Sequence, residues 1–214
     1  MFILRIFFIF LAYIIGAIPF GQIISRKIAG IDITLKGSGN IGATNVAREI
    51  GIKWGLLTLL LDLFKGFIPV FIIKNFIIDF EGIFLFTIAI AVILGHRFSP
   101  FLRFKGGKGV ATAFGIFLAL SPVSTIISLC AFFITVYFSG YVSLGSIVGA
   151  CIMPLTLSLF NKPAPLILTA FFTTIIILIA HSSNLFRIIK GNEPKWKQRN
   201  YDNNSSKRSN SSFE

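Results

Sequence analysis

The sequence predicts an all-α protein that crosses a membrane several times, and three observations support this fold class. First, 55% of the 214 residues are hydrophobic, and the chain contains 25 Phe. Second, the mean hydropathy of +0.85 is too high for a protein that must keep a water-facing surface. Third, apolar runs of about the length that crosses a bilayer recur along the chain, separated by short polar segments.

The first apolar run extends to about Ile24. It contains Gly16, Pro19 and Gly21 and has no A-x-A cleavage pattern, so it is expected to be a retained span rather than a signal peptide. Hydropathy predicts further spans at 54–73, 83–95, 142–160 and 164–181.

The region 109–138 is apolar but is interrupted by Ser121-Pro122, so one tilted helix and two short helices are both possible. Two helices give about seven spans, with the N-terminus outside and the C-terminus in the cytoplasm. Nearly all Lys and Arg residues then lie on the cytoplasmic side, as the positive-inside rule requires, whereas six spans would leave the basic C-terminus outside. We therefore predict about seven spans. Because 109–120 is short, we expect it to be a partial or re-entrant helix that contacts protein rather than lipid.

Residues 1–194 are predicted to form a single integral-membrane domain, and the polar, basic tail 195–214 is predicted to be a disordered cytoplasmic end. The net charge of +12 does not indicate nucleic-acid binding, because basic residues of a membrane protein normally face anionic lipid. Cys130 and Cys151 lie inside apolar runs, and neither histidine has a thiolate near it. No disulfide, metal site or cofactor is therefore expected.

Three polar segments rich in Gly, Ser and Asn stand between the apolar runs, and each carries Lys or Arg. They cover Lys36–Asn45, Phe104–Gly109 and His181–Arg187. Cations, short polar side chains and glycine-exposed backbone N–H groups are suited to binding phosphate. In the seven-span topology all three segments lie on the cytoplasmic face, so we expect them to bind anions there.

The first segment places short polar side chains around three glycines: Ser38, Asn40, Thr44 and Asn45. Arg48 follows, and its forked guanidinium could bind a phosphate if a helix begins near Ala43. The alternative interpretation is a turn followed by a capped helix without a binding role.

In the second segment, Gly106, Gly107 and Gly109 flank Lys108 immediately before an apolar helix. Backbone donors, the helix N-terminus and an ammonium group could therefore converge on one anion. The segment is not a Walker A loop, because Leu102 stands where the first glycine should be and Gly109 where a magnesium-binding Ser or Thr should be. Nucleotide hydrolysis is therefore disfavoured.

The third segment begins with His181 at the end of the last span, and Asn184 and Arg187 follow at intervals of three residues. A histidine at a membrane boundary is more often structural, but its position beside two other anion-suited segments favours a functional role. For His96, which precedes the glycine segment, ligand binding and orientation of that segment both stay open.

Asp62 and Lys65 lie three residues apart inside an apolar span. Ionisable groups in such a position are costly and usually functional, but these two can neutralise each other. A structural and a functional role are therefore both possible for this pair.

The stretches Ser38–Asn45, Gly95–Ser99 with Phe104–Thr112, and His181–Glu193 resemble, in this order, the three motifs of the bacterial acyl-phosphate-dependent glycerol-3-phosphate acyltransferases. The resemblance covers nearly the whole chain up to Glu193. It implies a seven-span enzyme of the bacterial cytoplasmic (inner) membrane. That enzyme would transfer a fatty acyl group from acyl phosphate to the sn-1 hydroxyl of glycerol 3-phosphate, giving lysophosphatidic acid and phosphate, the first acylation of phospholipid synthesis. The implied partners are these two substrates, membrane lipids and the enzyme that produces acyl phosphate.

Acyl phosphate has a good leaving group, so orienting two anionic substrates and neutralising their charge would be enough for catalysis. We expect the glycerol 3-phosphate side to be formed by Ser38, Arg48, Lys108, His181 and Asn184. The N–H groups of three glycines are expected to hold acyl phosphate: Gly106, Gly107 and Gly109. The remaining binding candidates are Asn40, which supports its loop, and Thr44, Asn45 and His96. His181 could act as a binding group, which we favour, or as a general base.

The alternative function is a transporter or channel for phosphorylated solutes. Such a protein needs polar residues deep within several spans. Here the polar residues concentrate at one predicted face, and apart from Asp62 and Lys65 the span interiors are nearly free of charge. The sequence therefore favours the acyltransferase.

Overall fold

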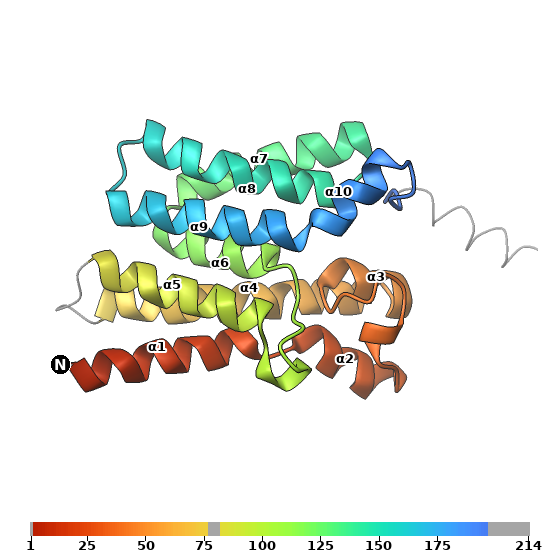
Figure 1. The fold of residues 1–214 in the computed structure, drawn as a ribbon, viewed down its shortest axis with the longest axis horizontal. Coiled ribbons are helices and arrows are strands. Elements are labelled where there is room, and N and C mark those ends of the chain that lie inside the picture. Colours follow the sequence, from red (N-terminus) through yellow and green to blue (C-terminus); the bar gives the residue numbers. More distant parts are fainter. Residues whose placement is uncertain (1, 77–81, 197–214) are drawn as a thin grey trace, which may run out of the picture.

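The computed structural model describes residues 2–76 and 82–196, and in these two ranges all regular structure is helical (Figure 1). The long helices are α1 (Phe2–Ala17), α4 (Ile52–Phe76), α5 (Gly82–Arg97), α7 (Pro122–Ser139), α8 (Val142–Leu159) and α9 (Ala164–Ala180). The shorter ones are α2 (Phe20–Ala29), η1 (Ile33–Leu35), α3 (Ala43–Ile50), η2 (Pro100–Leu102), α6 (Val110–Leu120) and α10 (Ser182–Ile189). Most of the predicted disordered tail lies outside the described residues.

The all-helical multi-pass fold is confirmed. Among the described residues, five helical stretches are long and apolar enough to cross a membrane, with α1 and α2 counted as one stretch. The pair α9 and α10, bent by 54°, would be a sixth. Helix α6 has 11 residues and is about 16 Å long, roughly half the ~30 Å thickness of the bilayer core. The seventh span and the orientation of the termini therefore stay predictions.

Helix α6 faces protein on all sides, because every one of its residues is buried or half-buried. It packs closely against α4, where Gly66 meets the backbone of Thr112 and Gly115 meets the backbone of Leu63. A side chain at either glycine would collide with the neighbouring main chain, so these small residues set the distance between the helices. The expectation that this helix contacts protein is confirmed, whereas its partial crossing of the membrane stays a prediction.

The first span is interrupted between α1 and α2, because Pro19 has no N–H with which to continue the helix. Two side chains compensate for the break: the Ser99 hydroxyl donates to the Ala17 carbonyl (2.6 Å), and the Lys65 ammonium donates to the Ile18 carbonyl (2.7 Å). Lys65 also forms a buried ion pair with Asp62 (2.7 Å). The charged pair inside the span thus has a structural role, because Lys65, paired with Asp62, satisfies the Ile18 carbonyl at the break between α1 and α2.

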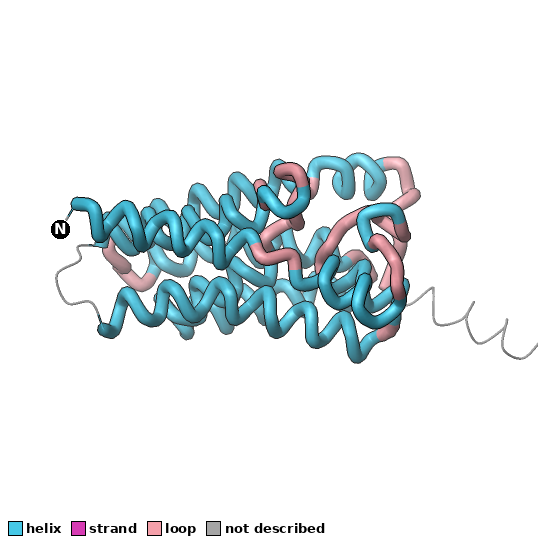
Figure 2. The backbone as a smooth tube through the Cα atoms, turned by 90° about the horizontal axis from the view of Figure 1, so that it is seen from below, coloured by secondary structure: helices cyan, strands magenta, loops and turns pink. Residues whose placement is uncertain are grey.

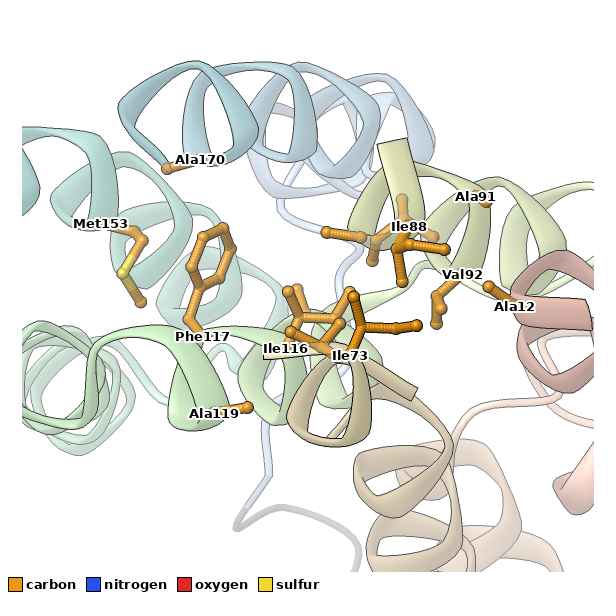
Figure 3. Packing of buried hydrophobic residues seen from close by; sticks show 14 of the residues in the cluster. Ala12, Ile73, Ile88, Ala91, Val92, Ile116, Phe117, Ala119, Met153 and Ala170 are labelled. Atoms are coloured by element: carbon orange, nitrogen blue, oxygen red, sulfur yellow. The ribbon is translucent and has the colours of Figure 1, made fainter. Parts of the chain in front are cut away.

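The core is formed by buried side chains of α1, α4, α5, α6, α8 and α9, several of which are shown in Figure 3. Ile88 and Val92 of α5 pack near Ile116 and Phe117 of α6, while Met153 comes from α8. The outer faces of α1, α4 and α7 instead expose many large apolar side chains. A surface of this kind is suited to contact with lipid acyl chains.

Helices α2, α3 and α10 gather at the end of the molecule opposite the N-terminus (Figure 1). Turned by 90°, the same end shows the short helices and loops grouped together (Figure 2). This end contains the first and third polar segments, and the loop before α6 brings the second one to them.

Candidate active site

A cavity of about 990 Å³ lies at the meeting point of the three polar segments. It is lined by ten of the predicted site residues: Ser38, Asn40, Thr44, Asn45, Arg48, His96, Lys108, Gly109, His181 and Asn184. The structure therefore brings together residues that are far apart in the sequence. Gly106 and Gly107 do not line the cavity.

The first loop is held in shape by the side chain of Asn45, which is 2% exposed. Its Oδ1 accepts from the Ser38 N–H (3.0 Å), and its Nδ2 donates to the carbonyls of Lys36 (3.0 Å) and Asn40 (2.8 Å). The Asn40 Oδ1 in turn accepts from the Gly42 N–H (2.8 Å). Asn45 thus positions the loop, and Asn40 supports it as expected.

Helix α3 begins at Ala43, as the phosphate-binding role of Arg48 requires. Arg48 lies in the last turn of this short helix and lines the cavity, where its Nη2 donates to the Pro194 carbonyl (3.4 Å). Arg48 therefore links α3 to the chain that follows α10.

The glycine loop is anchored by its backbone to the end of α5. The Gly106 N–H donates to the Arg97 carbonyl (3.0 Å), and the Gly107 N–H donates to the His96 carbonyl (3.1 Å). This corrects the expectation that these two N–H groups hold acyl phosphate, because both are already used within the protein. Gly109, with a φ of 83°, caps the N-terminus of α6 and lines the cavity.

His96 lies in the last turn of α5. Its ring is buried, with Nδ1 3.3 Å from the Thr112 hydroxyl, and it packs so closely against Gly107 that a Cβ there would meet its Nε2. Through its carbonyl and its ring, His96 orients the glycine segment, and it also lines the cavity.

Lys108 begins a chain of hydrogen bonds that ends at an acidic side chain. Its ammonium donates to the Asn184 Oδ1 (2.5 Å), and the Asn184 Nδ2 donates to the Glu193 Oε1 (2.6 Å). Glu193 also accepts from the Ser143 hydroxyl (2.7 Å) and forms an ion pair with Arg187 (2.8 Å). Glu193 therefore fixes the Asn184 amide so that its oxygen faces Lys108.

Two residues of this network, Glu193 and Ser143, were not among the site residues predicted from the sequence. One signal was available, because Glu193 is the only acidic residue between positions 82 and 201. A lone carboxylate among basic residues is a natural partner for them, but its link to Ser143, 50 residues away, cannot be read from local spacing.

The surroundings of the site lower the pKa of Glu193, which favours its charged carboxylate, and also lower the pKa of Lys108, which makes its ammonium group easier to deprotonate. Burial raises the pKa of Glu193, but hydrogen bonds from Asn184, Ser143 and Arg187 outweigh it and the net shift is downward. Burial lowers the pKa of Lys108 to about 8, Glu193 opposes this shift, and the positive charge of Arg187 adds to it. An anion bound beside Lys108 would favour the charged form of this residue.

His181 lies at the bend between α9 and α10 and is 2% exposed. Its Nδ1 is 2.8 Å from the Ile177 carbonyl, so Nδ1 carries the hydrogen, because a carbonyl oxygen can only accept. In the neutral imidazole Nε2 is then the acceptor. A hydroxyl group in the cavity could donate to it.

The cavity continues from this polar mouth into an apolar arm between α4 and α6 to α9. Its lining side chains there include Phe114, Phe117, Phe132, Met153 and Ile177. Leu59 and Phe133 line the cavity and are also exposed, at 41% and 58%, on the apolar outer surface. The arm is therefore suited to a fatty acyl chain that reaches the cavity from the membrane.

A cationic mouth joined to an apolar arm in a helical membrane fold is suited to binding a phosphorylated solute together with a lipid. Comparison with known proteins identifies the chain further. The model of a family described as glycerol-3-phosphate acyltransferase matches residues 6–191, so the chain belongs to this family.

Relatives named glycerol-3-phosphate acyltransferase include one from Desulfotalea psychrophila, 45% identical over 191 residues, which cover 88% of this chain and 96% of the relative. Another, from Fusobacterium nucleatum, is 41% identical over 190 residues, which cover 89% and 97%. The fold matches the crystal structure of PlsY (YgiH), an integral membrane glycerol 3-phosphate acyltransferase, in its glycerol 3-phosphate form. That match has a TM-score of 0.86 and 37% identity and covers 92% of this chain and 98% of PlsY. A lysophosphatidic acid form matches with a TM-score of 0.82 and 38% identity, over 89% and 94% of the two chains.

Proposed function

We propose that this protein transfers a fatty acyl group from acyl phosphate to the sn-1 hydroxyl of glycerol 3-phosphate, at the cytoplasmic face of the bacterial inner membrane. The observation that carries the proposal is that the cationic mouth and the apolar arm belong to one cavity. Such a cavity fits one small phosphorylated acceptor and one amphiphilic phosphorylated donor. The glycerol 3-phosphate and lysophosphatidic acid forms of PlsY support this acceptor and this product.

In the proposed step, the sn-1 oxygen attacks the acyl carbon, a new ester C–O bond forms, and the C–O bond to the phosphate breaks. The hydroxyl proton goes to the leaving phosphate, so the protein needs no strong base. Lys108 and Arg48 neutralise charge on the two substrates, and Asn184 is held toward Lys108 by Glu193. Catalysis then comes from orientation and electrostatic stabilisation.

His181 has a binding role in this mechanism, with Nε2 accepting from a hydroxyl group of glycerol 3-phosphate. The variant His181→Gln should raise the KM for glycerol 3-phosphate about tenfold while kcat falls less. Steady-state kinetics over a range of acceptor concentrations measures both constants. An unchanged KM with a kcat lowered about a thousandfold would instead identify His181 as the general base.

The proposed function is tested by comparing donors with purified protein in detergent. Acyl phosphate, acyl-CoA and acyl carrier protein loaded with the same fatty acid are each supplied with glycerol 3-phosphate. We expect 1-acyl lysophosphatidic acid from acyl phosphate alone, with phosphate release that requires glycerol 3-phosphate. Turnover with acyl-CoA at an equal rate, or a 2-acyl product, would contradict the proposal.

The cytoplasmic position of the site is tested by labelling in intact cells. Single cysteines replace Lys105 and Ser183, both exposed, in a chain whose Cys130 and Cys151 have been replaced. A membrane-impermeant maleimide should label neither position until the membrane is opened. Labelling of one position from outside the intact cell would place the two segments on opposite sides and contradict the proposal.

A further inference from the structure

A second hollow of about 240 Å³ lies beside the mouth of the main cavity. It is lined by three cationic side chains, Arg97, Lys108 and Arg187, together with Ser182, Ser183 and Gly39 among others. None of the described residues that line it is acidic. A hollow with this lining attracts anions, and the two serine hydroxyls can donate hydrogen bonds to one.

Arg97 is the feature of this hollow that the site described above does not use. It is the last residue of α5, and its carbonyl accepts the Gly106 N–H (3.0 Å), so its backbone is tied to the loop that carries Lys108. Burial is the main cause of the low pKa of Lys108, and the positive charges of Arg187, Arg48 and Arg97 add to it. These cations are therefore near enough to act on one group.

The size of the hollow suits a phosphate group. A water molecule has a share of ~30 Å³ in the liquid, so the hollow has room for several waters or for one phosphate with part of its hydration. Ser182 and Ser183 are exposed. The hollow therefore communicates with water, whereas the apolar arm of the main cavity reaches the lipid-facing side.

The proposed reaction, on which this inference rests, needs two separate places for phosphate. Both reactants carry a phosphate, and the sn-1 oxygen must come within about 3–3.5 Å of the acyl carbon. In glycerol 3-phosphate the sn-1 hydroxyl and the phosphate stand at opposite ends of the glycerol backbone. The two phosphates therefore need two adjoining positions, and the two hollows, which share Lys108 and Arg187, provide them.

We propose that the small hollow is a second phosphate-binding site, in which Arg97 and the Ser182 and Ser183 hydroxyls hold the phosphate of one reactant. The other phosphate lies in the main cavity beside Arg48. Lys108 contacts both hollows and bridges the two anions. If the phosphate in the small hollow is that of acyl phosphate, the same opening releases inorganic phosphate to water after the transfer.

The test uses Arg97→Gln and Arg97→Lys in the full-length protein, with Arg103→Gln as the matched control. Arg103 is an exposed cation of the following loop and lines neither hollow. The KM for each substrate and inhibition by inorganic phosphate are measured, and melting temperatures show that the variants are folded. We expect the KM for one of the two substrates to rise about tenfold in Arg97→Gln, because one charge-assisted hydrogen bond to its phosphate is lost. The KM should recover in part in Arg97→Lys and should not change in Arg103→Gln.

The pattern of the change distinguishes the two sources of the phosphate. A higher KM for glycerol 3-phosphate alone places the acceptor's phosphate in the small hollow. A higher KM for acyl phosphate, with weaker inhibition by inorganic phosphate, places the leaving phosphate there. If folded Arg97→Gln keeps both KM values and the inhibition constant within twofold of wild type, the second site is overturned. Activity of the wild-type protein with acyl phosphate is measured in the same series, so failure of the proposed function is recognised separately.

Discussion

The first polar loop and the glycine loop form two walls of the same cavity, but they are held in place in different ways. In the first loop a single buried side chain, Asn45, supplies hydrogen bonds to four backbone groups. In the glycine loop, main chain contacts main chain directly, because Gly106 and Gly107 allow the loop to lie against the end of α5. The first arrangement depends on polar groups and the second on the absence of side chains.

This difference shows that a glycine in a polar segment can have either of two structural roles. A glycine in a polar segment can expose an N–H group to a ligand, or it can permit close packing that uses the N–H group up. Gly106 and Gly107 are of the second kind, and their contribution is to position Lys108. The two loops should therefore respond differently to substitution.

The largest effect is expected from Gly106→Ala. A Cβ there would meet the backbone carbonyls of His96 and Arg97, which cannot move without breaking the contact between the loop and α5. We expect turnover to fall more than a hundredfold because Lys108 is displaced. Turnover and melting temperature in detergent measure the effect. The control is Gly82→Ala, whose Cβ would make only ordinary contacts with Pro165 at 3.5 Å and beyond. Near-normal turnover of Gly106→Ala would contradict this account of the loop.

The next largest effect is expected from Asn45→Ala. This variant removes the donor from the buried Ile33 carbonyl, at a cost of about 1–3 kcal/mol for a buried unsatisfied group, and from the half-buried hydrogen bonds to the Lys36 and Asn40 carbonyls. We expect the melting temperature to fall by roughly 5–10 °C and the KM for glycerol 3-phosphate to rise. Asn75→Ala, at an exposed asparagine that donates to the Phe71 carbonyl of its own helix, should have little effect. Equal melting temperatures for the two variants would show that Asn45 does not organise the loop.

A smaller effect, dependent on pH, distinguishes the cations of the two loops. The pKa of Lys108 is about 8, so its charge is present below that pH and is lost above it. The kcat/KM for glycerol 3-phosphate should therefore fall about tenfold per pH unit above about pH 8. Arginine keeps its charge in this range, so Lys108→Arg should remove the alkaline fall, at a lower overall rate. The same fall in Lys108→Arg would assign the titration to another group.

The smallest effect is expected from Gly107→Ala. Its Cβ would meet the ring of His96, a side chain, rather than the main chain that Gly106→Ala would meet. The imidazole can adjust in part, so we expect turnover to fall only several-fold. Comparing the two alanine variants in one assay tests whether the loop is held by its contact with the α5 main chain. A loss in Gly107→Ala as large as that in Gly106→Ala would argue against that distinction.

Much of the fold and of the site could be predicted from local patterns. Hydropathy indicated the spans, and the break at Ser121-Pro122 separated α6 from α7. The residue types of the three polar segments indicated anion binding, and ten predicted residues line one cavity. The break at Pro19 was not predicted, because a proline in an apolar run signals a helix break only if side chains such as Lys65 and Ser99 can satisfy the freed carbonyls.

The sequence by itself determined that this protein is helical and membrane-embedded, because the transfer of each apolar run from water to lipid depends on the residues of that run alone. It also determined three segments whose residue types suit phosphate. Only the tertiary structure decided which polar groups find each other. Lys108 meets Asn184 across 76 positions, and Glu193 joins both Asn184 and Ser143. It also decided that the Gly106 and Gly107 N–H groups serve packing rather than a ligand. Hydrogen bonds are short and directional, so their partners are fixed by how the helices pack and not by spacing along the chain.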